Sequence, residues 1–166
     1  MAIKRLNHAV LYVRSVNESV LFYTEQLGFK VKFQMPGAAF MSLPGGSNDH
    51  DLGLFEVGAD AQQSTAGRGS VGLYHLAWEV ETLGELQKFA ERLGAIGSLI
   101  GATDHGTTKA LYARDPSGLE FELSWLVPIE VMTAAEREVM QTEALDLDKE
   151  IARYGADTPG LQTVLY

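Results

Sequence analysis

The feature of this chain that most restricts its fold is an internal repeat. The segment "LNHAVLYVRSVNESVLFYTEQLGF" begins at Leu6, and "LYHLAWEVETLGELQKFAERLGA" begins at Leu73. When the two segments are aligned on His8 and His75, a Val follows five residues later in both, and a Leu-Gly pair closes both. The 67 residues between the two His exceed the period of solenoid repeats. The sequence therefore predicts two copies of one module.

Each copy has the pattern of one strand, one helix and three further strands. The opening stretch is rich in β-branched and aromatic residues, which favour strands. Apolar residues at helical spacing follow, and they end at Gly28 in the first copy and at Gly94 in the second. We therefore predict an α+β fold of two βαβββ modules, at 3–60 and 72–127, within a domain at 1–127. The later strands are expected at 29–35, 39–43, 51–57, 97–101, 109–114 and 119–125.

The remainder of the chain, 128–166, has a different character. It is rich in residues that favour helices, and Thr133 with Glu136 has the spacing of a capping box at a helix start. We expect a C-terminal helical extension that packs on the domain or on a second subunit.

The composition excludes several classes of partner and of chemistry. The formal net charge is −9, and such a surface repels nucleic-acid phosphates and anionic lipids. The chain contains no Cys, so any metal must bind through His, Asp or Glu. No leader peptide and no apolar run of membrane-spanning length is recognisable. We expect a soluble cytoplasmic protein without nucleic-acid or membrane partners.

Three polar residues interrupt apolar strand patterns. His8 and His75 each lie two residues into the predicted first strand of a module, and Glu122 lies in the last strand. A single His in a strand is more often a hydrogen-bonded core residue, but equivalent His residues in two modules favour a shared role. Two imidazoles and one carboxylate suit a divalent metal and leave coordination positions open. If the modules pack as curved sheets, these three residues can meet in one cavity.

Alternation along the last strand separates its side chains into two groups. Glu120 is two residues before Glu122 and should point to the same side, as a second polar partner or on an exposed rim. Trp78, Phe121 and Trp125 are offset from the predicted ligands by an odd number of residues. We expect these aromatic residues in the core, on the opposite face.

The segments "LNHAVLYVRSVNESVLFYTEQLGF", "LYHLAWEV" and "LYARDPSGLEFEL" resemble the vicinal oxygen chelate superfamily. It includes glyoxalases, fosfomycin and bleomycin resistance proteins, and extradiol ring-cleaving dioxygenases. The resemblance covers Ile3 to Val127, and it implies a cupped mixed sheet around one divalent metal held by His8, His75 and Glu122. The family's turn has an Asn after its Gly, whereas this chain has a Leu with the spacing to the Glu unchanged.

Three further residues resemble those of the catechol 2,3-dioxygenase type of extradiol enzyme. Tyr112, ten residues before Glu122, matches a Tyr that hydrogen-bonds a catechol oxygen, although it could also be a core Tyr. His50, in "NDHDLGLF", resembles an acid–base His, and His105, in "TDHGTTKALY", resembles a further active-site His. Both could also be loop residues. The resemblance implies Fe(II), with Mn(II) or Zn(II) also compatible, an aromatic diol and O₂ as substrates, and a homodimer.

Two alternative functions stay open. A glyoxalase-type lyase or isomerase requires a fourth ligand, a Glu in the last strand of the first module. Alignment puts Gly53 at that position and Glu56 three residues later, and a shift in the alignment would bring Glu56 to the metal. The other alternative is a metal-free binding protein of the resistance type, against which the presence of both His residues and the Glu argues.

Overall fold

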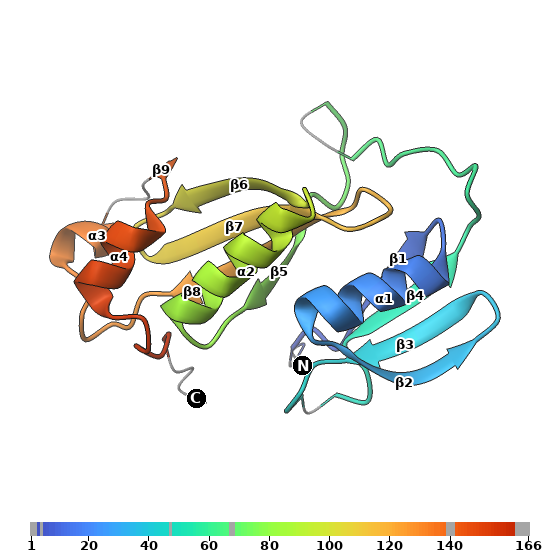
Figure 1. Cartoon of the computed structure of the whole chain (residues 1–166), viewed down its shortest axis with the longest axis horizontal. Coiled ribbons are helices and arrows are strands. Elements are labelled where there is room, and N and C mark those ends of the chain that lie inside the picture. The colour runs from blue at the N-terminus through green and yellow to red at the C-terminus, as the bar shows by residue number, and fades with distance from the viewer. Residues whose placement is uncertain (1–2, 4, 47, 67–68, 139–141, 162–166) are drawn as a thin grey trace. The chain divides into compact units, whose positions relative to one another are not determined.

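The computed structural model describes residues 3, 5–46, 48–66, 69–138 and 142–161, and the chain divides into two compact units (Figure 1). The first unit comprises Met1–Ser64 together with the turn Asp115–Gly118. The second comprises Thr65–Arg114 and Leu119–Tyr166. Each unit contains one strand–helix–three-strand module, which confirms the predicted α+β fold.

The first unit is a four-stranded sheet with one helix. The strand order is β1-β4-β3-β2, in which β1 and β4 are parallel and the other pairs are antiparallel. The sheet is therefore mixed, as expected. The elements of this unit are β1 (Ala9–Val13), α1 (Val16–Leu27), β2 (Lys30–Met35), β3 (Ala38–Ser42) and β4 (Leu52–Glu56).

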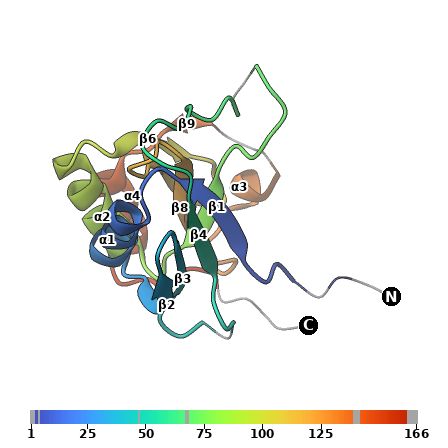
Figure 2. The ribbon, with the colours of Figure 1, turned by 90° about the vertical axis from the view of Figure 1, so that its right-hand side faces the viewer.

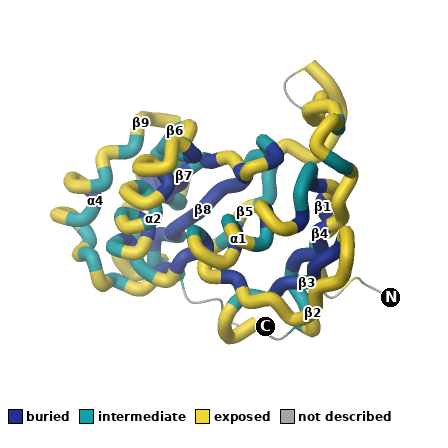
Figure 3. Tube along the Cα trace, turned by 45° about the vertical axis from the view of Figure 1, so that its right-hand side comes forward, coloured by how far each residue is buried: buried dark blue, intermediate teal, exposed yellow. Residues whose placement is uncertain are grey.

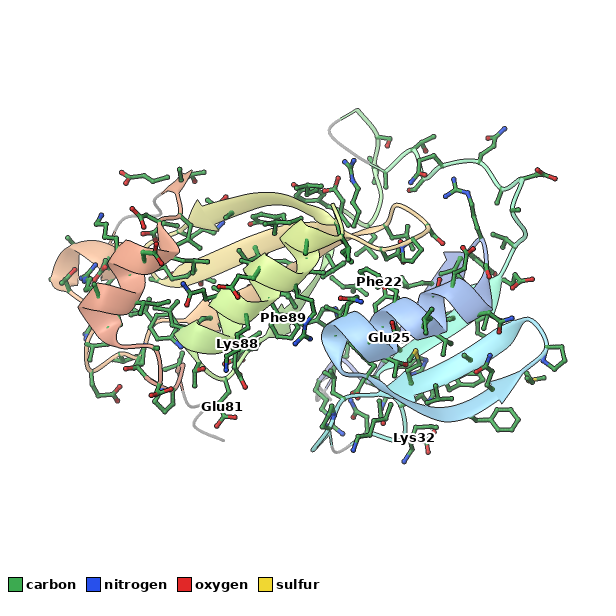
Figure 4. All side chains as sticks on the ribbon, in the orientation of Figure 1. Phe22, Glu25, Lys32, Glu81, Lys88 and Phe89 are labelled. Carbon is green, nitrogen blue, oxygen red and sulfur yellow. The ribbon has the colours of Figure 1, made fainter. Side chains whose placement is uncertain are left out.

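Helix α1 covers one face of this sheet. It begins after Ser15, whose hydroxyl accepts the N–H of Glu18, and it ends at Gly28, whose φ of +77° is strained for other residues. The turned view of Figure 2 shows α1 on one side of the strands. Glu25 lies on the exposed outer side of the helix (Figure 4). The residues buried on the sheet beneath it are Leu11, Val13, Ala39, Met41, Leu52 and Leu54.

The opposite face of the first sheet is apolar but exposed. Tyr12 pairs with Phe55 across β1 and β4, so both side chains point to this face, and they are 72% and 36% exposed. Phe40 contacts Phe55 edge-on, with ring centroids 5.9 Å apart, and Phe33 lies 6.5 Å from Phe40. Among the described residues of this unit, no helix covers these aromatic rings. We call these four residues the aromatic face of the first sheet.

The second unit has a five-stranded sheet in the order β5-β8-β7-β6-β9. Strands β5 and β8 are parallel, and the other pairs are antiparallel. Its elements are β5 (Leu76–Glu79), α2 (Leu83–Ala95), β6 (Leu99–Asp104), β7 (Thr108–Arg114), β8 (Glu120–Leu126), α3 (Ala134–Glu138), β9 (Glu143–Ala144) and α4 (Leu147–Tyr154).

The core of the second unit lies between its sheet and α2. Phe121 and Trp125 are buried on the face of β8 opposite to Glu122, as predicted, and Trp78 is half-buried. Figure 3 shows β7 and β8 as the most continuously buried strands of this unit. Other buried side chains of this core are Leu83, Leu86, Leu93, Leu111, Ala113 and Leu123.

The C-terminal extension packs on the second unit. The predicted capping box forms at the start of α3, because Glu136 accepts the N–H of Thr133 at 2.8 Å and Thr133 Oγ1 accepts the N–H of Glu136. Instead of one continuous helix, two short helices flank β9, which pairs with β6. Gly160 N–H donates to the carbonyl of Glu81, which precedes α2 (Figure 4). The sequence pattern did not predict β9, because β9 pairs with β6, a segment far away in the chain.

The sequence Asp-Pro-Ser-Gly between β7 and β8 forms a tight turn that belongs to the first unit. Gly118 N–H donates to the carbonyl of Asp115 at 2.9 Å, and Ser117 N–H donates to its carboxylate. Gly118 has a φ of +80°, and a Cβ there would meet the amide of Gln63 at 2.7 Å. Burial and the adjacent Asp115 raise the pKa of Tyr23, whose hydroxyl donates to that carboxylate. Asp115 is thus a turn residue.

None of the helices in the described parts of the chain combines the length and the apolar character needed to cross a bilayer.

Candidate metal and substrate site

The two repeated His residues hold equivalent places immediately before a strand. They were predicted two residues within the strands, but pairing begins only at Ala9 with Leu52 in the first unit and at Leu76 with Phe121 in the second. The difference of one to two residues arises because the partner strand decides where ladder pairing starts. Each imidazole therefore lies at a sheet end, where its ring atoms are not confined between neighbouring strands.

In the second unit, His75 and Glu122 face each other. His75 Nε2 lies 3.0 Å from Glu122 Oε2, and the two side chains are 23% and 12% exposed. Two atoms that each lie about 2.1 Å from one metal at a right angle are about 3 Å apart. The two side chains are in direct hydrogen-bonding contact, and the same separation is compatible with two neighbouring ligands of one divalent ion.

The surroundings of this pair fix the Glu more firmly than the His. The Ser124 hydroxyl donates to Glu122 Oε1, which leaves Oε2 toward His75. The ring of Tyr74 lies tilted beside the imidazole, with ring centroids 4.5 Å apart and 56° between the ring planes. His75 Nδ1 is buried and has no hydrogen-bond partner within the described part of the chain. A ligating imidazole uses one nitrogen for the metal, so Nε2 is the donor that this geometry favours.

Tyr112 joins this cluster from the neighbouring strand. It pairs directly with Glu122 across β7 and β8. Burial, followed by the charge of Glu122 and a hydrogen bond to it, raises the pKa of Tyr112 to about 12. The Tyr112 hydroxyl also lies 2.9 Å from His105 Nε2. Because the single phenol proton goes to the carboxylate, which can only accept, His105 Nε2–H must donate the second bond.

In the first unit, His8 contacts His50, with ring centroids 4.5 Å apart. His8 Nδ1 lies 2.6 Å from the side-chain amide oxygen Oδ1 of Asn7, which can only accept, so the ring proton is on Nδ1 and Nε2 keeps its lone pair. Nε2 of His8 is thus available to a metal. The imidazole of His50 therefore lies directly beside the imidazole of His8.

Asp49 orients the ring of His50. His50 Nδ1 lies 3.0 Å from Asp49 Oδ2. This hydrogen bond is the main cause that lowers the pKa of Asp49, and the charge of Lys32 on β2 (Figure 4) adds to it. An ionised Asp49 favours a proton on Nδ1, which leaves Nε2 of His50 able to accept a proton. The ring of Phe40 from the aromatic face contacts the same imidazole at 5.1 Å.

The structure thus gathers the predicted site residues into two clusters, one in each unit. The second unit brings together His75, Glu122, Tyr112 and His105, and the first unit brings together His8 and His50. Over the residues that the structure describes, no group of three or more His, Asp or Glu side chains could hold a metal ion. The roles of the six residues stay predictions.

The model of the Glyoxalase/Bleomycin resistance protein/Dioxygenase superfamily matches residues 5–123 of the chain. The chain belongs to this superfamily. It is 32% identical over 122 residues to biphenyl-2,3-diol 1,2-dioxygenase 3 of Rhodococcus globerulus, which covers 72% of this chain and 62% of that protein. It is 31% identical over 118 residues to catechol-2,3-dioxygenase of Bacillus subtilis (strain 168), which covers 71% of this chain and 40% of that protein.

The chain therefore spans less than two thirds of the length of these curated relatives. Among solved structures, it is similar to a glyoxylase/bleomycin resistance protein/dioxygenase domain from Frankia sp. EAN1pec. That likeness has a TM-score of 0.61 and 25% identity, and it covers 74% of this chain and 92% of the Frankia chain. It agrees with the superfamily fold.

Within this superfamily fold, Gly53 holds the place in β4 that corresponds to Glu122 in β8. Val10 pairs with Gly53 and Ala77 pairs with Glu122, and the two partners are 67 residues apart, as are His8 and His75. The first unit therefore has no carboxylate at the position equivalent to Glu122. This supports the sequence alignment that placed Gly53 there.

The side chain of Glu56 does not point to the face of β4 on which Gly53 lies. It is three residues after Gly53, so alternation turns it to the face of β4 that α1 covers. Its Oε2 accepts the N–H of Val16, the first residue of α1, at 2.9 Å. A carboxylate at a helix start satisfies an otherwise unpaired N–H and interacts favourably with the helix dipole. Glu56 is therefore a helix-start residue in this structure.

Two further side chains, Ser124 and Asn7, support the site and were not predicted from the sequence. Ser124 donates to Glu122, and its position two residues after Glu122 predicts the same strand face. Asn7, which precedes His8, fixes the tautomer of that ring, and no pattern in the sequence marks it. Glu120 lies on the rim, where it binds Arg114 at 2.7 Å, which agrees with one of its two predicted roles.

Proposed function

We propose that this chain is a metal-dependent extradiol dioxygenase that cleaves a catechol-like ring beside its hydroxyl groups. The observation that carries the proposal is a cluster in the second unit, in which Tyr112 on β7 contacts both His105 and Glu122, the partner of His75. A phenol donor next to a proposed pair of metal ligands suits a substrate with two adjacent oxygens. The two curated relatives above, named as aromatic diol dioxygenases, support the same class of reaction.

The proposed ligands are His8, His75 and Glu122. The donor set fits a divalent metal, because Nε2 of His8 keeps its lone pair and the His75–Glu122 separation is that of neighbouring ligands. A bound divalent metal, with Fe(II) as our first choice, would supply adjacent coordination positions for a diol and O₂. Glu122 contributes the single negative charge of the ligand set, which favours a monoanionic diol over a dianion.

His50, Tyr112 and His105 are the proposed catalytic group. His50 takes a proton from a diol hydroxyl and returns it later, since an imidazole titrates near neutral pH and its Nδ1 is oriented by Asp49. Tyr112 turns its hydroxyl proton from Glu122 to a substrate oxygen. His105 donates to the Tyr112 oxygen and so fixes the direction of that proton.

The aromatic face of the first sheet supports an aromatic substrate. Phe40 contacts His50, so this apolar surface continues to the proposed acid–base residue. Aromatic side chains bind planar apolar rings through stacked and edge-on contacts. A diol ring would place one hydroxyl at His50 and its carbon edge on these rings.

The glyoxalase-type alternative has less support in the structure. It requires a fourth carboxylate ligand from the first module, but Gly53 holds that position and Glu56 binds the start of α1. Three protein ligands leave more open coordination positions than four, which favours a reaction with two small substrates.

The test is anaerobic loading of the protein with Fe(II), followed by measurement of oxygen uptake with a panel of catechols. Methylglyoxal–thiol adducts are assayed in parallel, and His8→Ala serves as the control that should lose metal and activity. Uptake of one O₂ per diol with a coloured ring-opened product supports the proposal. Isomerisation of the adduct without oxygen supports the glyoxalase type, and a wild-type protein that binds no divalent metal supports the metal-free binding protein. The predicted homodimer is tested by light scattering on the same sample.

A further inference from the structure

A buried lysine connects the C-terminal extension to the strand that carries Tyr112. Lys109 lies on β7, and its side chain is only 1% exposed. It pairs with Trp125 across β7 and β8, so it points to the core face, opposite to the face of Tyr112. A buried ammonium costs several kcal/mol unless it has charged partners. The partners of Lys109 therefore must be held in place.

Two carboxylates from different parts of the chain surround this ammonium. Lys109 Nζ donates to Oδ1 of Asp104 at 2.6 Å, and it lies 3.0 Å from Oε2 of Glu150 on α4, whose side chain is 3% exposed. The ring of Tyr154, also on α4, lies 5.7 Å from the ammonium. Two of these three partners come from the C-terminal extension, which lies outside residues 5–123 that match the superfamily.

Asp104 connects Lys109 to the turn that contains His105, because it binds both. The same Oδ1 accepts the N–H of Gly106 at 2.7 Å, so it fixes the backbone directly after His105. The main chain of His105 donates to the carbonyl of Thr108 at 2.9 Å and closes the turn between β6 and β7. The side chain of His105 then reaches Tyr112. A shift of Asp104 would therefore move the imidazole relative to the phenol.

Contacts with α3 and α2 fix the position of helix α4, and therefore the position of Glu150. Arg153 forms a two-point ion pair with Glu136 of α3, at 2.6 and 3.1 Å, and the hydroxyl of Tyr154 donates to the same carboxylate. Asp148 accepts from Gln87 on α2 at 3.1 Å. The contacts with Glu136 hold α4 on α3 within the extension, and the contact with Gln87 joins α4 to α2.

We propose that Glu150 is a positioning residue for His105, acting through the buried charge of Lys109. The C-terminal extension thus helps to orient the Tyr112 hydroxyl. This inference rests on the proposed function. Glu150 touches neither the substrate nor the predicted ligands. Its role is to hold Lys109 and Asp104 where the turn needs them.

The test compares Glu150→Gln, which keeps the size and removes the charge, with Asp148→Asn on the same helix. Asp148 accepts from Gln87, and an Asn at this position keeps the accepting oxygen while it removes the charge, so this variant is a matched control. The first readout is the ¹⁵N NMR signal of the His105 ring in the full-length protein. We expect Glu150→Gln to lose the signature of a hydrogen-bonded Nε2–H, whereas Asp148→Asn keeps the wild-type signal. In the kinetic assay with a catechol, we expect kcat to fall on the order of tenfold with KM nearly unchanged.

A second variant covers the case in which Glu150→Gln does not fold. The double variant Lys109→Met with Glu150→Leu removes both buried charges, and apolar replacements of buried ion pairs often keep stability. It should show the same loss of the His105 signal in a folded protein. A folded variant of either kind with an unchanged His105 signal overturns the inference. If the wild type takes up no oxygen with any catechol, the dioxygenase proposal fails, and the NMR signal still decides the role of Glu150.

Discussion

Oε2 of Glu56 accepts the N–H of Val16 at 2.9 Å, which ties the last residue of β4 to the first residue of α1. The contact predicts that Glu56→Gln weakens folding without affecting metal binding. Because the lost charge interacts with a helix start, we expect a loss of about 0.5–1 kcal/mol in the free energy of unfolding, measured with urea. Metal content after Fe(II) loading should equal that of the wild type. A proportional loss of bound metal would show that Glu56 is a ligand.

The place of Gly53 opposite Val10 predicts the effect of adding a carboxylate there. A Cβ at Gly53 would meet Val10 Cγ2 at 3.4 Å, an ordinary contact, so Gly53→Glu can fold. We expect this variant to bind metal and to lose oxygen uptake by at least about tenfold, since a fourth ligand would occupy a position needed by substrate. Gly53→Gln is the control of equal size. Equal oxygen uptake in the Glu and Gln variants would argue against this reasoning.

The raised pKa of Tyr112, about 12, predicts a phenol that stays protonated at all pH values at which the protein is assayed. Tyr112→Phe should keep the bound metal and lower kcat/KM by about tenfold or more, because one hydrogen bond to the substrate is lost. The pH profile of kcat/KM should keep its shape up to about pH 10, since no titration of the phenol occurs there. Loss of a profile limb in Tyr112→Phe would assign that limb to the Tyr.

The pKa of Glu136 predicts that the C-terminal extension is sensitive to acid. Burial would raise this pKa, but hydrogen bonds from Thr133, Arg153 and Tyr154 prevail and lower it to about 2, from 4.5. A group with a lowered pKa in the folded state stabilises the fold above its unfolded pKa, and this contribution is lost as pH falls from about 4.5 to 2.

The measurement for this prediction is the free energy of unfolding across that pH range, followed by the fluorescence of Trp125. This side chain donates to the carbonyl of Thr158 and lies against Tyr154, so its emission reports on the extension. The variant Glu136→Gln should be less stable near neutral pH and should lose less stability on acidification than the wild type. Parallel curves for the two proteins would contradict the assigned pKa.

Local patterns predicted most of the fold. The repeat of His8 and His75 led to two modules, and period-two alternation placed Phe121 and Trp125 in the core on the face opposite to Glu122. Those inferences hold because alternation and helical spacing are properties of short segments. The capping box at Thr133 is a similarly local signal.

The interactions that sequence reasoning could not find are those between distant segments. No sequence pattern marked Lys109 as a buried residue, and only the fold brings Glu150 to it from α4. The break between α3 and α4 depends in the same way on pairing of β9 with β6. The exact start of β1 depends on its partner β4. Such contacts involve residues many positions apart, so no spacing rule marks them.

The discontinuous first unit has a practical consequence for dissecting the protein. A gene fragment that encodes only the first module would omit Asp115–Gly118 and so deprive the buried Tyr23 hydroxyl of its acceptor. Arg14, whose guanidinium donates to the carbonyl of Ser117, would lose a second anchor. Asp115–Gly118 lie in the second half of the sequence but belong to the first unit. A separately produced first half, or a chimera that contains it, must therefore include these four residues.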